Sequence, residues 1–153
     1  MNALPVLTYH SIDDSGSPVS IAAAEFRRQM QALAAAGWRT LAMDAFVRGH
    51  RDGGWPERTF LLTFDDGYDD VYEYAFRALQ QHGMVGTFFV TTDFVERPGY
   101  LTWDQIQEMA DAYESLESSL DQSAEDLGLT EDVNQALQQA QQAAGGQQEE
   151  EAQ

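Results

Sequence analysis

Two adjacent carboxylates, Asp65 and Asp66, end an apolar run over residues 59–64 and are followed at once by Gly67. Neighbouring residues of an extended strand point to opposite faces, so both acids reach one site only where the strand ends and a glycine lets the backbone turn. In open α/β sheets and β/α barrels, the reaction site is built from residues at the carboxyl ends of buried strands, and acids placed there fit this pattern. Taken alone, the three residues are more typical of an acidic turn, in which Asp and Gly are common.

The surrounding sequence favours the reaction site. Residues 63–68 read TFDDGY, and residues 86–90, one helix later, read GTFFV. Over residues 4–112 the chain resembles the first half of a polysaccharide deacetylase, the NodB-homology domain. The resemblance implies an α/β fold, a partial (β/α) barrel with parallel strands. It also implies a metal-dependent hydrolase that removes acetyl groups from N-acetylated amino sugars in a polysaccharide or oligosaccharide.

The resemblance implies a role for each acid. In the family, the first aspartate of the motif is the general base that activates a water, and the second binds a divalent metal, usually zinc, which polarises the acetamide carbonyl. Carried over to this chain, Asp65 is the catalytic base and Asp66 is a metal ligand. His10 ends the first predicted strand on the same side as the acids, and a Tyr-His pair is frequent there in the family. It is therefore a candidate neighbour in the active site, although a hydrogen-bonded surface histidine fits the position equally well.

The later motifs of the family pattern are missing from this chain. Family members complete the metal site with a His-Ser/Thr-x-x-His motif, but no histidine or arginine follows Ala112. A catalytic zinc normally has three protein ligands, and one aspartate does not supply them. His50 and His82 are expected at the opposite edge of the sheet from Asp65, so neither replaces the motif.

Two hypotheses for the function follow. The first is a polysaccharide deacetylase-like hydrolase whose site is incomplete in this chain. The second is a truncated or fused fragment without catalytic activity that acts as an interaction module. The missing histidine pair separates the two, because a hydrolase of this type needs its metal held by further ligands.

The remaining pattern predicts the elements that position these residues. Apolar runs bounded by turn residues predict parallel strands, and the 3.6-residue periodicity between them predicts helices. Strands are expected at residues 4–9, 38–41, 59–64 and 85–90, and helices at residues 20–36, 45–48, 69–82 and 103–112. Ser20 and Asp44 are expected to cap their helices, and Thr102 with Gln105 forms a capping-box pattern.

Charge divides the chain into two parts. Residues 1–110 carry 15 acids and all 8 arginines, whereas residues 111–153 carry 11 acids and no base. We therefore expect a deacetylase-like part over residues 1–112 and an acidic, Gln/Glu-rich helical tail over residues 113–153 that is disordered at its end. The net charge of −18 argues against nucleic acid and anionic lipid surfaces as partners.

Composition also bears on location and metal chemistry. The chain has no cysteine, which excludes disulfides and thiolate metal sites. No run approaches the roughly 20 apolar residues of a membrane span. The opening residues lack the basic and apolar regions of a signal peptide, which predicts a cytoplasmic protein, although members of the family it resembles are often exported.

The strand ending at Val90 is expected to have an unpaired edge, because no following strand is apparent in the sequence. Unpaired backbone and an uncovered apolar face favour pairing with another chain. The sequence therefore predicts either poor stability or self-association through this open edge of the sheet.

Overall fold

The computed structural model describes residues 3–126 of the chain, which divides into two units, Met1–Asp111 and Ala112–Gln153. Within the described residues, all the strands belong to the first unit. The elements in order are β1 (Val6–Tyr9), α1 (Ala23–Ala35), β2 (Arg39–Leu41), α2 (Met43–Asp52), β3 (Thr59–Phe64), the π-helical turn η1 (Val71–Phe76), α3 (Arg77–Gln81), β4 (Thr87–Phe88), the 3-10 turn η2 (Thr92–Phe94) and α4 (Trp103–Asp126). None of the described helices has the length and apolar character needed to cross a membrane.

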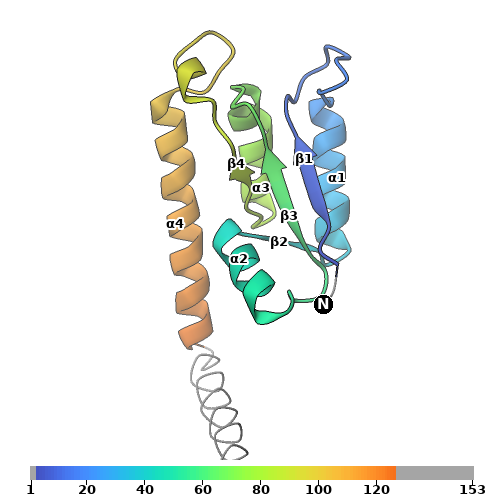
Figure 1. The fold of residues 1–153 in the computed structure, drawn as a ribbon, viewed down its shortest axis with the longest axis vertical. Coiled ribbons are helices and arrows are strands. Elements are labelled where there is room, and N and C mark those ends of the chain that lie inside the picture. Colours follow the sequence, from blue (N-terminus) through green and yellow to red (C-terminus); the bar gives the residue numbers. More distant parts are fainter. Residues whose placement is uncertain (1–2, 127–153) are drawn as a thin grey trace, which may run out of the picture. The chain divides into compact units, whose positions relative to one another are not determined.

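β3 is the central strand of a four-stranded sheet in which every pairing is parallel. β1 pairs along one side of β3 (Figure 1). On the other side, β2 pairs with the first half of β3 and β4 with its last two residues. The predicted α/β architecture with parallel strands is confirmed, and all strand carboxyl ends face the same edge of the sheet.

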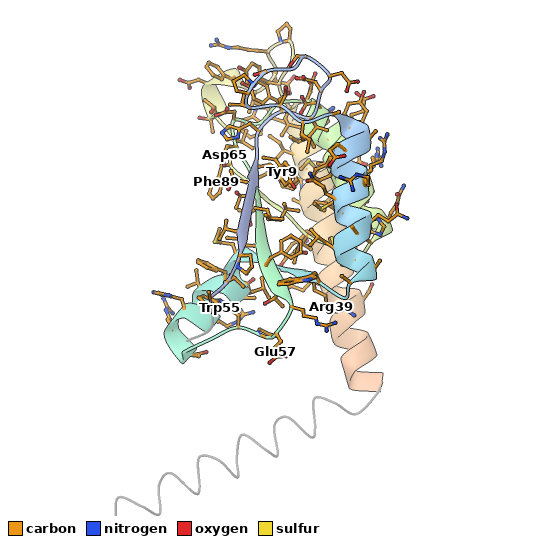
Figure 2. All side chains as sticks on the ribbon, turned by 90° about the vertical axis from the view of Figure 1, so that its right-hand side faces the viewer. Tyr9, Arg39, Trp55, Glu57, Asp65 and Phe89 are labelled. Carbon is orange, nitrogen blue, oxygen red and sulfur yellow. The ribbon has the colours of Figure 1, made fainter. Side chains whose placement is uncertain are left out.

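The core lies between one face of the sheet and the helices. All six residues of β3 are buried, as expected of a continuous apolar run at the centre of a parallel sheet. Phe64 lies on the helix-facing side, where its ring centroid is 5.8 Å from that of Phe26 on α1 and 4.7 Å from that of Phe88 on β4. Leu79 on α3 joins the same cluster. Figure 2 shows α1 on this side of the strands and α2 on the other.

The opposite face of the sheet is only partly covered. Thr8 and Thr63 share a hydrogen bond between their hydroxyls, 2.9 Å apart, on this face. The side chains of Val6 and Phe89 are each 51% exposed. The predicted strand over residues 85–90 is also shorter than expected: only Thr87–Phe88 forms β4.

Two of the predicted helix starts were wrong. α1 begins at Ala23 with Ala22 before it, because the amide and hydroxyl of Ser20 both donate to the carbonyl of Ser17 and leave no cap for the helix. α2 starts at Met43 and runs to Asp52, well beyond the predicted residues 45–48. Residues 49–52, which follow the predicted helix, are therefore also helical.

The capping box at the start of α4 is confirmed. The Thr102 amide donates to Gln105 Oε1 at 2.9 Å, and the Gln105 amide donates to Thr102 Oγ1 at 3.2 Å. The helix does not end near residue 112 as predicted but continues to Asp126. The predicted tail is thus helical as far as it is described, and its predicted disordered end lies outside the described residues.

Candidate active site

His10 and Asp65 meet at the carboxyl edge of the sheet because their strands are in register. Tyr9 pairs with Phe64, and the Asp65 amide donates to the Tyr9 carbonyl at 2.9 Å, so the next residues on the two strands are neighbours. His10 Nε2 lies 3.8 Å from Asp65 Oδ2. The two side chains are 34% and 36% exposed, respectively, so both are open to a ligand from solvent.

The chain leaves the strand through two left-handed residues in succession. Asp66 has a φ of 72° and Gly67 a φ of 78°. The left-handed region is normal for glycine, but it is uncommon for an aspartate and costs about 1–3 kcal/mol where the surrounding structure imposes it. The turn is held from outside, since the Leu101 amide donates to the Gly67 carbonyl at 3.0 Å and the Asp69 amide to the Gly99 carbonyl at 3.2 Å. Backbone strain of this kind concentrates at functional sites.

The other two histidines lie elsewhere. His50 is on the last turn of α2, where its ring stacks on Trp55 with centroids 6.5 Å apart. His82 is the residue that ends α3. Of the three histidines, the structure therefore places only His10 beside Asp65.

The residues at this edge do not form a complete zinc site. Within residues 3–126, no group of three His, Cys, Asp or Glu side chains is placed to hold a metal ion. His10 and Asp65 are close enough to share a ligand, but a catalytic zinc has three protein ligands. No catalytic step through a metal can be derived from these residues alone.

A hydrogen-bonded group beside the site was not predicted from the sequence. Ser11 Oγ lies 2.6 Å from Asp13 Oδ2 and 2.5 Å from Asp70 Oδ2. One hydroxyl carries one proton, so it cannot donate fully to both carboxylates. Burial raises the pKa of Asp70, whereas hydrogen bonds from Ser11 and Ser15 hold the pKa of Asp13 well below its usual range. Asp70 Oδ1 is buried and has no hydrogen-bond partner among the described residues, which adds to the cost of a charged carboxylate at this position.

This arrangement predicts how stability changes with pH. Because the pKa of Asp70 is raised on folding, the folded state binds this proton more tightly than the unfolded chain. The Asp70 contribution to the free energy of unfolding therefore falls as the pH rises from about 4 through the folded pKa, and is lowest at neutral pH. The Asp70→Asn variant should lack this pH dependence of the free energy of unfolding, and it should not be less stable than the wild type at pH 7.

Urea unfolding of the wild type and Asp70→Asn between about pH 4 and pH 7 measures the effect. Asp93 gives the control, because it is exposed and is not among the charges that shift the pKa of Asp70, so Asp93→Asn should follow the wild-type curve. A lowered Asp13 pKa acts in the opposite sense, since its contribution is lost as the pH falls. Identical pH profiles for Asp70→Asn and the wild type would show that Asp70 carries no extra proton in the fold.

Comparison with known proteins points to one family. The sequence profile of the family described as polysaccharide deacetylase matches residues 52–143. The Bacillus subtilis (strain 168) protein YxkH, whose name describes it as a polysaccharide deacetylase, is 36% identical over 134 residues. That alignment covers 87% of this chain and 48% of YxkH. Both matches continue past Ala112, so the resemblance extends further along the chain than the motifs indicated.

Solved structures show the same relationship. IcaB from Ammonifex degensii superimposes with a TM-score of 0.63 and 32% identity, over 73% of this chain and 50% of that one. BC0361, a polysaccharide deacetylase from Bacillus cereus, superimposes with a TM-score of 0.61 and 31% identity, over 71% and 36%. The chain spans about half, or less, of the length of the relatives it matches.

Proposed function

Because this chain belongs to the polysaccharide deacetylase family, we propose that its carboxyl-edge site takes part in the metal-dependent removal of N-acetyl groups from amino sugars. The observation that carries the proposal is the 3.8 Å approach of His10 and Asp65 beside the strained turn at Asp66. The substrate class is supported by a relative from Escherichia coli (strain K12), a poly-β-1,6-N-acetyl-D-glucosamine N-deacetylase that is 27% identical over 128 residues.

In this proposal Asp65 is the general base. An ionised carboxylate at the edge of the sheet can accept a proton from a water as that water attacks the acetamide carbon. The 3.8 Å separation from His10 is longer than a hydrogen bond but short enough for both side chains to contact one bound water or substrate group. His10 is therefore proposed as an active-site neighbour of the base.

Asp66 is the proposed ligand of a divalent metal, with zinc the expected ion. When bound, the metal would polarise the carbonyl and stabilise the negative charge that develops on its oxygen. Since the described residues do not complete its coordination, we propose that the chain alone is an incomplete hydrolase. The alternative, an inactive interaction module that self-associates through the open edge beside β4, is favoured by the same missing ligands.

Zinc titration followed by an acetate assay tests the proposal on the full chain. We expect zinc to bind, and its affinity to fall at least about tenfold in Asp66→Asn, because a carboxylate ligand is lost. Asp69→Asn, which changes an exposed acid three residues away, should bind zinc as the wild type does. Acetate release from a tetramer of N-acetylglucosamine should stay at background.

Each other outcome selects a different account. Zinc affinity unchanged by Asp66→Asn would contradict the ligand assignment. Acetate release that disappears in Asp65→Asn would show that the chain is a complete hydrolase. Zinc-independent dimers without metal binding, observed by sedimentation, would favour the interaction module.

A further inference from the structure

Phe89 lies beside Asp65 on the side opposite His10. β4 pairs with β3 through Phe64 and Phe88, and the Phe89 amide donates to the Phe64 carbonyl at 2.8 Å. The register therefore places residue 89 next to residue 65 in the same way that the β1 register places residue 10 there. His10, Asp65 and Phe89 form one row across three strand ends, and Figure 2 labels Asp65 and Phe89 close together at that end of the sheet.

The Phe89 ring points away from the core. Side chains alternate along a strand, and the preceding ring, Phe88, stacks on Phe64 on the helix-facing side. Phe89 consequently projects from the other face, the one that carries Thr8 and Thr63. The residue is 51% exposed, so its ring is accessible to a ligand from solvent.

Other aromatic rings lie along the chain that leaves β4. Among the described residues, three of the exposed large apolar side chains are aromatic. They are Phe89, Phe94 and Trp103. One of them, Phe94, packs on Tyr100 with centroids 4.9 Å apart, and Tyr100 stacks at 5.2 Å on Tyr68, the residue after Gly67. An exposed ring therefore lies beside Asp65, and the stacked ring of Tyr68 belongs to the same turn as the two acids.

A sugar ring fits this surface better than the other common ligands of acidic sites. The face of a pyranose carries C–H bonds that pack on the electron-rich face of an aromatic ring, while its hydroxyl and acetamide groups remain at the edge. N-acetylated amino sugars are uncharged, so the net charge of −18 does not repel them as it repels phosphates and nucleic acids. Phe89 adjoins the proposed base, so a sugar resting on it would present its acetamide near Asp65.

We propose that Phe89 is a substrate-binding residue whose ring supports the amino sugar next to Asp65. The inference rests on the proposed function for its ligand, but it concerns binding and needs neither a bound metal nor turnover. A second copy of the chain is the competing occupant of the exposed ring, since open sheet faces also pair with one another.

NMR titration of the full chain with a tetramer of N-acetylglucosamine tests the proposal. We expect Phe89→Ala to weaken binding about tenfold, equivalent to about 1.4 kcal/mol, while Phe89→Trp keeps it. The matched control is Val6→Ala, which truncates an equally exposed side chain on the same face, but at the start of β1. This control should bind as the wild type does.

Three results would overturn the proposal. The first is an unchanged affinity of Phe89→Ala for the sugar, and the second is no binding by the wild type up to about 10 mM sugar. The third is a Phe89→Ala effect that appears only in the sedimentation coefficient, which would assign the ring to self-association. The outcome is separable from that of the proposed function. Binding that depends on Phe89 without zinc affinity at Asp66 would contradict the metal site alone, and zinc affinity without sugar binding would contradict Phe89 alone.

Discussion

Phe64→Ala is expected to lower the free energy of unfolding by about 3–5 kcal/mol, the range for removing a buried phenylalanine. The ring is 1% exposed and has aromatic neighbours on three elements. Its centroid lies 5.8 Å from that of Tyr9, 5.8 Å from that of Phe26 and 4.7 Å from that of Phe88. Small domains are stable by only about 5–15 kcal/mol, so this substitution should remove much of the stability.

Urea unfolding followed by circular dichroism measures the loss. Phe94→Ala is the control, because that ring is 36% exposed and its removal should cost about 1 kcal/mol or less. Phe64 also directly precedes Asp65, so any folded population of Phe64→Ala should show altered NMR shifts for His10. A loss in Phe64→Ala no larger than that in Phe94→Ala would contradict the position of this ring in the core.

The centre of the fold could be predicted because one strand dominates it. The run TFLLTF over Thr59–Phe64 predicts a buried strand, and all six residues are buried in the structure. Parallel pairing then follows from the strand-helix-strand order, and it brings the carboxyl ends of β1 and β3 together. The approach of His10 to Asp65, residues 55 positions apart in sequence, was therefore inferable from the sequence.

Element ends were less predictable because tertiary contacts decide them. Ser20 is a good N-cap by type, but its hydroxyl bonds the Ser17 carbonyl in the loop that pairs with Ser11. The fourth strand starts later than predicted, because the Val85 amide donates to the Thr40 hydroxyl at 2.7 Å and not to the backbone of a neighbouring strand. Sequence periodicity contains no information about such distant partners.

The helix that follows the acids shows the same limit. Its spacing of apolar residues predicted an ordinary α-helix, but Val71–Phe76 is a π-helical turn before α3 begins. The wider turn still buries Val71, Ala75 and Phe76 against the core. π-helical turns frequently occur at functional sites, and this one begins five residues after Asp66.

Two features of the site needed the folded chain. Ser11 and Asp70 are 59 positions apart, and neither residue type by itself suggests that their side chains form a hydrogen bond. Phe89 belongs to an apolar run that predicts a fully buried strand. Only the register with β3 shows that Phe89, and not Phe88, faces solvent. Residue types and spacing were therefore enough to identify the two acids. The groups that surround them could not be identified from the sequence, because long-range packing decides their positions.

Gly67→Ala is expected to have the second-largest effect, because two costs coincide at this position. The residue has a φ of 78°, where an alanine costs about 1–2 kcal/mol. A Cβ there would lie 3.0 Å from Val90 Cγ1 and 3.4 Å from Val90 Cα, so the β4 end or the acid-bearing turn must shift. We expect a total loss in the free energy of unfolding of roughly 2–4 kcal/mol, together with a lower zinc affinity as Asp66 moves.

The chain offers a control that separates the two costs. Gly53 has a φ of 92° but no heavy atom within 4 Å of a Cβ, so Gly53→Ala carries the backbone strain alone and should cost about 1–2 kcal/mol. Adding Val90→Ala to Gly67→Ala removes the methyl carbon at 3.0 Å, so the double variant should cost less than the two single losses together. Strict additivity, or equal losses at Gly53 and Gly67, would mean that the turn has room for a side chain. In that case the position of the two acids would not depend on the contact between this glycine and Val90.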